Sequence, residues 1–455
     1  MFDGALLKDA KHIHFIGVGG SGMFPIVEIL LAQGFQISGS DNNESDTLAL
    51  ERAMGVHVLP LGQRAENIAG ADLIVYTAAI MDDNPELLAA RQSGIPTVER
   101  AEVLGYLTAQ YANCICVCGT HGKTTVTAML TQMLLESGLD PTAVIGGKLP
   151  LIGGNGRSGK SDLMVCEACE FADHFLQLSP DVAVILNVDA DHLEYFGSLE
   201  NIIHSFHRFA EMTSRTLIVN GSDPNTMQAI EGIPGKEVIT FGWEEACDYA
   251  PANLRHEGGV VSSFDLRCHG RTLARLTLNI PGRHNILNAV AACAAAIHAG
   301  VPVTALAEFL GHFHGAGRRF EVLGKVRGVT IADDYAHHPA EIAATLKAAK
   351  ELDFRRVWAV FQPFTYSRTQ LLMDDFAAAL SIADQVVMSE IMGAREKNTY
   401  GVHTSQLAEK IPGSVWFPAF PEIAAYVMEH AQEGDLVITL GCGDVYKCAK
   451  IMLCQ

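Results

Sequence analysis

The stretch C-G-T-H-G-K-T-T carries the residue types of a phosphate-binding loop. Gly119 and Gly122 would free the backbone to wrap around phosphates, and Lys123 could reach the β- and γ-phosphate oxygens. Thr124 could ligate Mg²⁺ through its hydroxyl. The loop is shorter than the usual Walker A loop, because Val117 stands where the first glycine of that pattern belongs. Shortening changes how the loop wraps phosphates, and a lysine-capped turn is the alternative interpretation.

A second glycine-rich stretch lies near the start of the chain. Gly17, Gly19 and Gly22 follow an apolar run with the spacing G-x-G-x-x-G, and a helical pattern comes next. Asp41 lies 24 residues beyond Gly17. This arrangement is typical of a turn whose backbone approaches a diphosphate at a helix N-terminus. It predicts a diphosphate ligand without specifying which one, and a tight turn that only packs a helix on a strand is the alternative.

Acidic residues follow two other apolar runs. Glu167 and Glu170 end one run, and Asp191 and His192 end another. Magnesium prefers oxygen ligands, so the carboxylates are candidates to hold an ion beside Thr124. Histidine is a poor magnesium ligand by its chemistry, so the residue type alone argues against His192 as a ligand.

A glycine loop or a strand-end carboxylate of this kind is positioned by a strand before it and a helix after it. The sequence shows three blocks in which strand-like and helical patterns alternate. We predict an α/β fold of three domains with mostly parallel sheets and ligand sites at the carboxyl ends of the strands. The domains are an N-terminal Rossmann-like domain (1–108), a central domain with a P-loop ATPase-like parallel sheet (109–318) and a C-terminal Rossmann-like domain (319–455). Between about residues 220 and 270 the pattern predicts an irregular segment with turns.

Composition narrows the class of protein. A chain of 455 residues suggests roughly three domains, and 49% hydrophobic with 18% charged residues is ordinary for a globular enzyme. The net charge of −20 argues against a nucleic-acid or anionic-membrane partner, because phosphate backbones are bound by clustered lysine and arginine. The first residues show no signal pattern, no apolar run approaches ~18 residues, and the eleven cysteines then predict a reduced, cytoplasmic protein.

Six further motifs occur in a fixed order along the chain: G-T-H-G-K-T-T, E-A-C-E, N-x-x-x-D-H, P-G-R-H-N-x-L-N-A, G-x-G-R-R-F and D-D-Y-A-H-H-P. Together they make the sequence resemble the Mur ligase family, which builds the peptidoglycan stem peptide in the bacterial cytosol. F-I-G-V-G-G-S-G-M, F-Q-P-F-T-Y-S-R-T and G-C-G-D are similar to the branch that adds L-alanine. The resemblance implies an ATP-dependent ligase of cell-wall biogenesis that joins L-alanine to the lactyl carboxylate of UDP-N-acetylmuramate through an acyl phosphate.

The resemblance also implies roles for individual residues, with ATP and Mg²⁺ at the second glycine loop and the UDP-sugar at the first. The residues that it places around ATP are Gly119, Thr120, His121, Gly122, Lys123, Thr124, Thr125, His284, Asn285, Asn288, Arg319, Asp333 and Asp334. The residues that it places around the UDP-sugar are Gly17, Gly19, Gly20, Ser21, Gly22 and Asp41.

The resemblance further implies an amino-acid pocket, a metal site and a catalytic set. The pocket would comprise Tyr335, His337 and Arg368. The magnesium ligands would be Thr124, Glu167 and His192, and here the resemblance, not ligand chemistry, supports the histidine. The catalytic residues would be Lys123, Glu167, His192, Arg319 and His337.

The chain departs from the family pattern at three places. E-A-C-E-F-A replaces the usual E-A-D-E-S-D, Phe364 stands where a histidine is common, and no lysine lies between His192 and Lys236 to be carbamylated as in several relatives. Three alternatives to the alanine-adding ligase stay open: a murein-peptide ligase, a nicotinamide-dependent oxidoreductase that uses the first glycine loop, or a non-catalytic nucleotide-binding protein. Arg318 and Arg319 could be a solvated pair, and the histidines before Pro339 could cap a helix. The sequence does not specify an oligomeric state.

Overall fold

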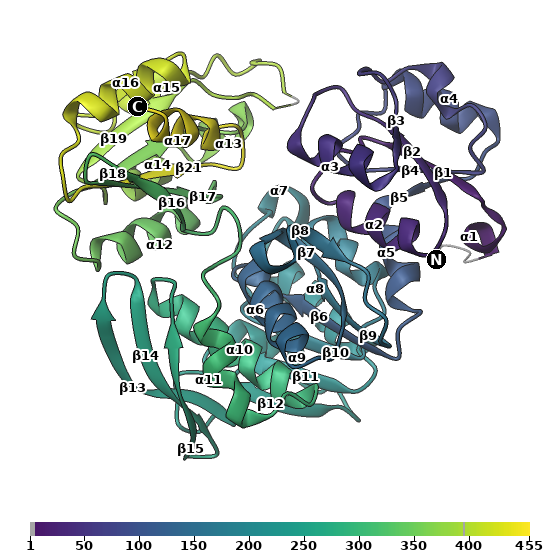
Figure 1. Ribbon diagram of the computed structural model, residues 1–455, viewed down its shortest axis with the longest axis horizontal. Helices are drawn as coiled ribbons and strands as arrows, with labels where there is room; N and C mark the ends of the chain where they lie inside the picture. Colours follow the sequence, from purple (N-terminus) through teal and green to yellow (C-terminus); the bar gives the residue numbers. More distant parts are fainter. Residues whose placement is uncertain (1–4, 395) are drawn as a thin grey trace. The chain divides into compact units, whose positions relative to one another are not determined.

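The computed structural model describes residues 5–394 and 396–455. The chain folds into two compact units, each described by itself. Unit 1 contains the described residues up to Ala252 together with 265–275 and 287–310, and unit 2 contains 253–264, 276–286 and 311–455. Over the described residues the strands form three sheets covered by helices, which confirms the predicted α/β class (Figure 1). Their strands lie within 12–99, 113–278 and 321–440, so each sheet falls inside one predicted domain, whose boundaries stay a prediction.

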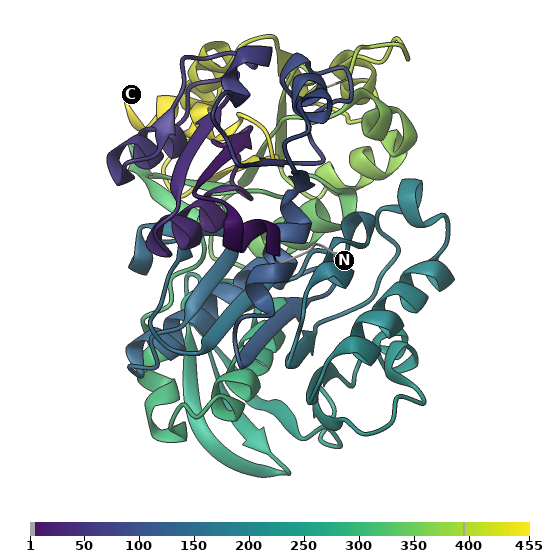
Figure 2. The ribbon, with the colours of Figure 1, turned by 90° about the vertical axis from the view of Figure 1, so that its right-hand side faces the viewer.

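The first sheet is parallel, with the strand order β3-β2-β1-β4-β5 (Figures 1 and 2). Its strands are β1 (His12–Ile16), β2 (Gln36–Ser40), β3 (His57–Val58), β4 (Leu73–Tyr76) and β5 (Thr97–Glu99). The helices of this region are α1 (Ala5–Asp9), α2 (Phe24–Ala32), α3 (Asp46–Met54), α4 (Pro85–Ser93) and α5 (Arg100–Thr108). Along β4, Leu73 and Val75 join one core and Ile74 joins another. Both faces are therefore buried, as a parallel sheet requires.

The second sheet has the strand order β15-β14-β13-β12-β11-β10-β6-β9-β7-β8. The strands nearest the phosphate loop are β6 (Asn113–Cys118), β7 (Thr142–Leu149), β8 (Gly154–Arg157), β9 (Leu163–Glu167) and β10 (Val182–Ile185). β6 pairs in parallel with both β9 and β10, so the residues that follow these three strands meet at one edge of the sheet. β8 alone among these pairs runs antiparallel, against β7. Cys114, Cys116 and Cys118 point into one core from alternate positions of β6.

The segment predicted to be irregular contains strands instead. These are β12 (Glu237–Phe241), β13 (Tyr249–Gly258) and β14 (Val261–Cys268), and the strands β11 (Thr216–Asn220) and β15 (Arg271–Leu278) flank the segment. Only alternate positions of β14, such as Phe264 and Leu266, are fully buried, and most of β13 is exposed. Long apolar runs therefore do not form here, which is why the prediction of loops was wrong.

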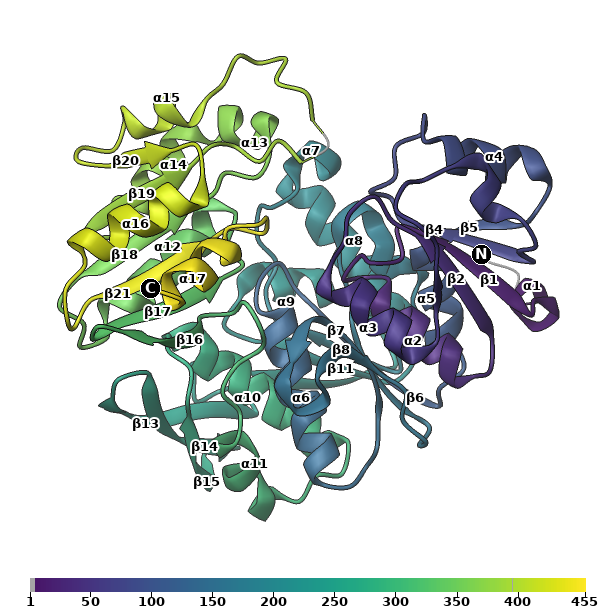
Figure 3. The same cartoon turned by 45° about the horizontal axis from the view of Figure 1, so that its top comes forward.

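The third sheet, in unit 2, has the strand order β16-β17-β21-β18-β19-β20 (Figure 3). Its strands are β16 (Glu321–Val326), β17 (Val329–Asp334), β18 (Val357–Phe361), β19 (Gln385–Ser389), β20 (Val415–Phe417) and β21 (Leu436–Leu440). All neighbours are parallel except β16 and β17. Ala359 and Phe361 face the core under α12 (Pro339–Lys350) and α14 (Met373–Leu380), whereas Trp358 and Val360 face α16 (Phe420–His430) and α17 (Tyr446–Leu453). Within the described part of the chain, no helix has the length and apolar character that a membrane crossing would require.

A buried carboxyl stands out in the helix that follows β2. α3 begins at Ser45, whose hydroxyl accepts the Leu48 amide, and Glu51 lies one turn further along. Glu51 is 0% exposed, and neither carboxylate oxygen has a hydrogen-bond partner among the described residues. Burial raises the pKa of Glu51 to about 8, the Asp41 charge adds to the rise, and Arg52 opposes it. The fold therefore holds this carboxyl best when it is protonated.

We expect Glu51→Met to stabilise the fold by about 1–3 kcal/mol at pH 8 and by less at pH 5. In the unfolded chain Glu51 loses its proton near pH 4.5, but in the fold it keeps the proton up to about pH 8. The native state therefore binds more protons between these values, so wild-type stability falls as pH rises through this window, and methionine removes that loss. Urea unfolding at both pH values measures the effect, with the exposed Glu66→Met as the control. An equal gain at pH 5 and pH 8 would contradict it.

Candidate active site

The short phosphate loop joins β6 to α6 (Lys123–Glu136) in a conformation that needs its glycines. Gly119 has φ 139° and Gly122 has φ 88°, both in the region that glycine adopts without strain. A Cβ on Gly122 would lie 2.6 Å from Oδ1 of Asn288, and a Cβ on Gly119 would lie 2.9 Å from the Cβ of Leu186. The structure thus brings Asn288, predicted as an ATP contact, against the loop.

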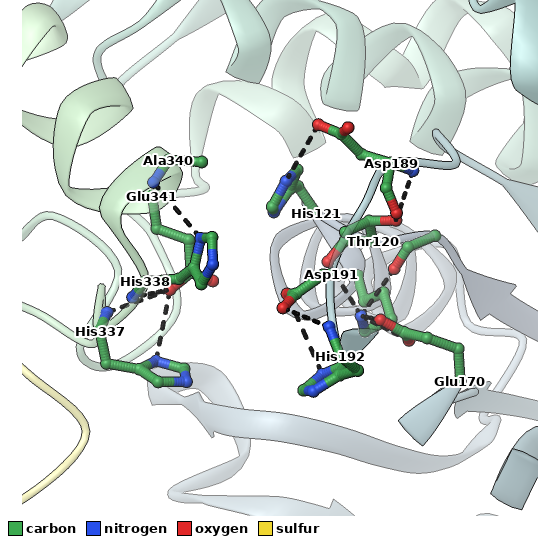
Figure 4. Close-up of polar contacts among 12 residues, drawn as sticks. Thr120, His121, Glu170, Asp189, Asp191, His192, His337, His338, Ala340 and Glu341 are labelled. Carbon is green, nitrogen blue, oxygen red and sulfur yellow. Dashed lines mark hydrogen bonds and ion pairs between the residues drawn. The ribbon is translucent and has the colours of Figure 1, made fainter. Parts of the chain in front are cut away.

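Asn187 fixes the tip of this loop and was not predicted as a site residue. Its Oδ1 accepts the His121 amide at 2.8 Å, and its Nδ2 donates to the His121 carbonyl at 3.0 Å. Its own carbonyl accepts the Thr120 amide at 3.0 Å. The Thr120 hydroxyl in turn accepts the Asp189 amide at 2.9 Å (Figure 4). The sequence did contain a signal for this residue, because Asn187 is the first residue of the N-x-x-x-D-H motif that follows β10.

Lys123 is held by the loop and by one carboxylate. Its Nζ donates to the carbonyls of Gly119 at 2.6 Å and Thr120 at 3.1 Å, and it lies 2.8 Å from Oε2 of Glu170. The side chains of Lys123 and Glu170 are 14% and 3% exposed. Burial alone would lower the Lys123 pKa, but the Glu170 charge, Cys169 and the Glu170 hydrogen bond raise it above its usual value. The ammonium therefore stays charged at neutral pH, ready for phosphate oxygens.

Glu167 and Thr124 place two oxygen donors side by side. The Thr124 hydroxyl donates to Oε1 of Glu167 at 2.9 Å, and the Gly146 amide donates to Oε2 at 2.6 Å. A Cβ on Gly146 would lie 2.4 Å from Oε1, so only glycine lets the carboxylate approach the backbone of β7. A hydroxyl beside a carboxylate is a donor set that suits Mg²⁺, so these two residues fit the predicted ion.

His192 sits at the start of the short helix α7 (Leu193–Phe196) with φ 53°. Its amide donates to Oδ1 of Asp191 at 2.7 Å, and its ring lies 4.9 Å from the Phe171 ring, centroid to centroid (Figure 4). Among the described residues no group of three or more His, Cys, Asp and Glu side chains is arranged to hold a metal ion. A magnesium ion shared by Glu167 and His192 stays a prediction.

The first glycine loop connects β1 to α2 and is tied to the end of β2. Gly17 has φ 82°, and the amides of Gly17 and Val18 both donate to the Ser40 carbonyl, at 2.9 and 3.0 Å. The Asp41 carboxylate accepts the Gly19 amide at 3.1 Å. Asp41 thus lies at the predicted place, directly after β2, but in this structure it caps the loop itself.

The end of the same loop meets a cation that the sequence analysis missed. Nη1 of Arg100, the first residue of α5, donates to the Gly22 carbonyl at 3.4 Å. A guanidinium beside a diphosphate loop is suited to an anionic ligand. Gly20 and Ser21 complete the loop, and the Ser21 carbonyl accepts a hydrogen bond from Asn155. Arg100 belongs to none of the motifs described above, so the sequence did not point to it.

In unit 2 both arginines of the pair lie beside Tyr335, and Arg318 also makes hydrogen bonds to other residues. Nε of Arg318 donates to Asp333 at 2.8 Å, and its Nη2 donates to the Gly441 carbonyl at 2.5 Å. The Arg319 guanidinium lies 5.3 Å from the centroid of the Tyr335 ring. The Arg318 guanidinium lies over the same ring at 5.0 Å. Because Arg318 is also hydrogen-bonded to Asp333 and Gly441, the solvated-pair interpretation does not describe it.

The two aspartates that end β17 are also engaged internally. Asp333 accepts Arg318 and the Thr439 hydroxyl, and it is 1% exposed. Asp334 accepts the amides of Phe320 and Ala336, each at 2.7 Å. Burial raises the pKa of Asp334 to about 6, although Arg319 and these amides oppose the rise. Contact of either carboxylate with the ATP ribose stays a prediction.

Tyr335 and His337 lie against each other, and the charge of Arg368 acts on the His337 imidazole, whereas an amino-acid pocket formed by all three stays a prediction. The His337 ring lies edge-on to Tyr335 at 5.6 Å, and its Nδ1 lies 3.3 Å from Oε2 of Glu341. Burial lowers the pKa of His337, Glu341 opposes this, and the charges of Arg368 and Arg319 lower it further. The imidazole is therefore neutral near pH 7, with two guanidinium groups close by.

Arg368 belongs to α13 (Tyr366–Leu371), whose first turn is capped by the Thr365 hydroxyl. It is half-buried, and no hydrogen bond or ion pair joins its guanidinium to another described residue. Its charge also opposes the burial that raises the pKa of Cys442 to about 12. A half-buried guanidinium without an internal carboxylate is suited to bind one from a ligand.

The remaining predicted residues lie at helix starts. His338 caps α12, because its Nδ1 accepts the Ala340 amide at 3.4 Å, so the capping interpretation holds for this histidine. His284 and Asn285 begin α10 (Arg283–His298), where Nδ2 of Asn285 donates to the Pro281 carbonyl at 2.7 Å. Thr125 follows Thr124 in α6 and is 7% exposed. ATP contact by these residues stays a prediction.

Three segments of the chain match family descriptions. Residues 12–112 match the Mur ligase family catalytic domain, residues 117–296 the Mur ligase middle domain, and residues 318–443 the Mur ligase glutamate ligase domain. The three matches follow the three sheets in order.

Individual proteins resemble the chain over nearly its whole length. The UDP-N-acetylmuramate–L-alanine ligase of Agathobacter rectalis is 44% identical over 449 residues, which cover 97% of each sequence. The crystal structure of a UDP-N-acetylmuramate–alanine ligase from Thermotoga maritima superposes with a TM-score of 0.84 at 27% identity, over 98% of each chain. A murein peptide ligase from Psychrobacter arcticus shares the fold, with a TM-score of 0.75 at 24% identity over 98% of each chain.

Proposed function

This chain belongs to the Mur ligase family, and on that premise we propose that it joins L-alanine to the lactyl carboxylate of UDP-N-acetylmuramate with ATP, as a cytoplasmic step of peptidoglycan precursor synthesis. The observation that carries the proposal is identity of 44% over 97% of a relative named for this reaction. The site chemistry agrees with it. Lys123, charged and held in a glycine loop, suits a phosphate, and Arg368, whose guanidinium has no hydrogen bond or ion pair to a described residue, suits a carboxylate.

The first chemical step falls to the residues of the phosphate loop. The lactyl carboxylate attacks the γ-phosphorus of ATP, and an acyl phosphate and ADP result. Negative charge grows on the γ-phosphate oxygens, where Lys123 and Arg319 would offset it. Thr124 and Glu167 would hold Mg²⁺, which supplies further positive charge at those oxygens when bound. Glu170 keeps Lys123 protonated and aimed at the loop.

The second step needs the amino acid to be oriented. We assign its carboxylate to Arg368, because the guanidinium can donate two parallel hydrogen bonds to it. The alanine amine then attacks the acyl carbon through a tetrahedral intermediate, and phosphate leaves. Burial keeps the imidazole of His337 neutral near pH 7, so it could accept a proton from the alanine ammonium group and leave the free amine that attacks. Tyr335 would line the same pocket.

The test is phosphate release from ATP with UDP-N-acetylmuramate and one acceptor at a time. We expect turnover with L-alanine, and much less with L-serine, glycine or a murein tripeptide. Preference for the tripeptide would make the chain a murein-peptide ligase and overturn the proposed acceptor. Turnover without UDP-N-acetylmuramate would remove the sugar nucleotide from the reaction altogether.

A further inference from the structure

A single asparagine on β8 connects the two glycine-loop regions of unit 1. Nδ2 of Asn155 donates to the Ser21 carbonyl at 2.7 Å and to the Ile145 carbonyl at 3.0 Å. Ser21 belongs to the first glycine loop, and Ile145 lies in the central sheet on β7. Neither the glycine motifs nor the family motifs described above include Asn155.

The flanking residues show that this contact is built into the fold. Gly154 and Gly156 stand on either side of Asn155. A Cβ on Gly156 would lie 2.5 Å from Cα of Pro25, and one on Gly154 would lie 3.1 Å from the Phe24 ring. The first turn of α2, which follows the first glycine loop, therefore rests on the backbone of β8, and at Gly156 the Pro25 backbone leaves no room for a Cβ.

The connection continues to the ATP side through one peptide group. The Ile145 carbonyl that accepts Asn155 and the Gly146 amide that donates to Glu167 belong to the same peptide bond, which is planar and rigid. Turning that plane would move the Gly146 N–H away from Oε2 of Glu167, to which it now donates at 2.6 Å. The other oxygen of Glu167 accepts the Thr124 hydroxyl. Asn155 thus fixes the orientation of a group that aims the predicted metal carboxylate.

We propose that Asn155 is a positioning residue that couples occupancy of the first glycine loop to the placement of Glu167 at the ATP site. This inference rests on the proposed function and on the predicted binding of the UDP-sugar by the first glycine loop. A diphosphate held by the loop amides would fix Ser21, and through Asn155 the Ile145–Gly146 peptide. By thermodynamic reciprocity, Mg²⁺ and nucleotide at the second loop would then tighten UDP-sugar binding by the same factor.

The test compares the Kd of UDP-N-acetylmuramate with and without Mg²⁺ and a non-hydrolysable ATP analogue. We expect the wild-type protein to show a ratio of about fivefold or more, within the usual range of coupling between sites. In Asn155→Ala and Asn155→Asp the ratio should fall to near one. Aspartate keeps the volume and removes both N–H donors, so a residue that only fills space would leave Asn155→Asp close to wild type.

The matched control is Asn113→Ala, which removes an asparagine bonded to Arg215 and Asp162 at the start of β6, away from both loops. It should keep the wild-type ratio. A readout without any substitution is hydrogen exchange of the segment 142–149, which should slow when UDP-N-acetylmuramate alone is added. Wild-type binding without coupling, or a full ratio in both Asn155 variants, would overturn the inference and leave the proposed function standing. No binding of UDP-N-acetylmuramate to the wild-type protein would overturn both.

Discussion

Replacing Lys123 with alanine is expected to lower kcat for ATP-dependent ligation by about a thousandfold, the loss seen when a preorganised charge stabiliser is removed. The reason is the position of the Lys123 Nζ, which is held within the phosphate loop by the carbonyls of Gly119 and Thr120 and by the Glu170 carboxylate. UDP-N-acetylmuramate should still bind with nearly its wild-type Kd, because its predicted residues surround Gly17 on a different sheet. Single-turnover phosphate release and a UDP-sugar titration measure the two quantities separately.

The control for this substitution must separate the loss of activity from the loss of stability that an unpaired Glu170 would cause. Alanine at position 123 leaves the Glu170 carboxylate, 3% exposed, without its cation, and an unpaired buried charge costs about 3–5 kcal/mol of stability. The double variant Lys123→Met with Glu170→Gln replaces both charges and should recover most of that stability. Its activity should stay as low as that of Lys123→Ala. If the double variant regained turnover to within about tenfold of wild type, Lys123 would contribute less than ~1.4 kcal/mol to the transition state and would not be the phosphate ligand.

The glycine loops illustrate what the sequence could predict. An apolar run that ends in an acidic residue predicts where a strand ends and its side chain becomes accessible, so Glu167 was placed correctly at the end of β9. Parallel pairing then brings such ends together without further information. The same logic located Lys123 at the first position of α6.

Partners chosen by three-dimensional packing were beyond the sequence. Glu167 and Glu170 both end the same apolar run, but they have different partners in the structure. The Thr124 hydroxyl donates to Glu167, and Lys123 donates to Glu170. Gly146 carries no motif, although its missing side chain is what admits the Glu167 carboxylate to β7. Likewise, the sequence could not distinguish Arg318 from its neighbour Arg319, whereas in the structure Arg318 donates a hydrogen bond to Asp333. Each distinction depends on contacts between residues far apart in the chain.

Arg368→Lys should raise the KM for L-alanine by about 10- to 150-fold, equivalent to the 1.5–3 kcal/mol of a hydrogen bond to a charged group. Lysine keeps the charge but cannot donate two parallel hydrogen bonds to a carboxylate. The KM for ATP should stay within about twofold of wild type, because that change removes no predicted ATP ligand. Steady-state kinetics with alanine varied at saturating ATP and UDP-N-acetylmuramate measure the effect.

A second arginine of unit 2 provides the matched control for this experiment. Arg355 stands just before β18, at the opposite end of that strand from α13, and its guanidinium already makes two hydrogen bonds to Asp435. Arg368 follows the same strand but makes no such bond to a described residue. Arg355→Lys should therefore leave the alanine KM unchanged and at most lower stability, since its partner is internal. An unchanged alanine KM in Arg368→Lys as well would mean that the guanidinium does not bind the substrate carboxylate, and the amino-acid pocket would have to be sought elsewhere than beside His337.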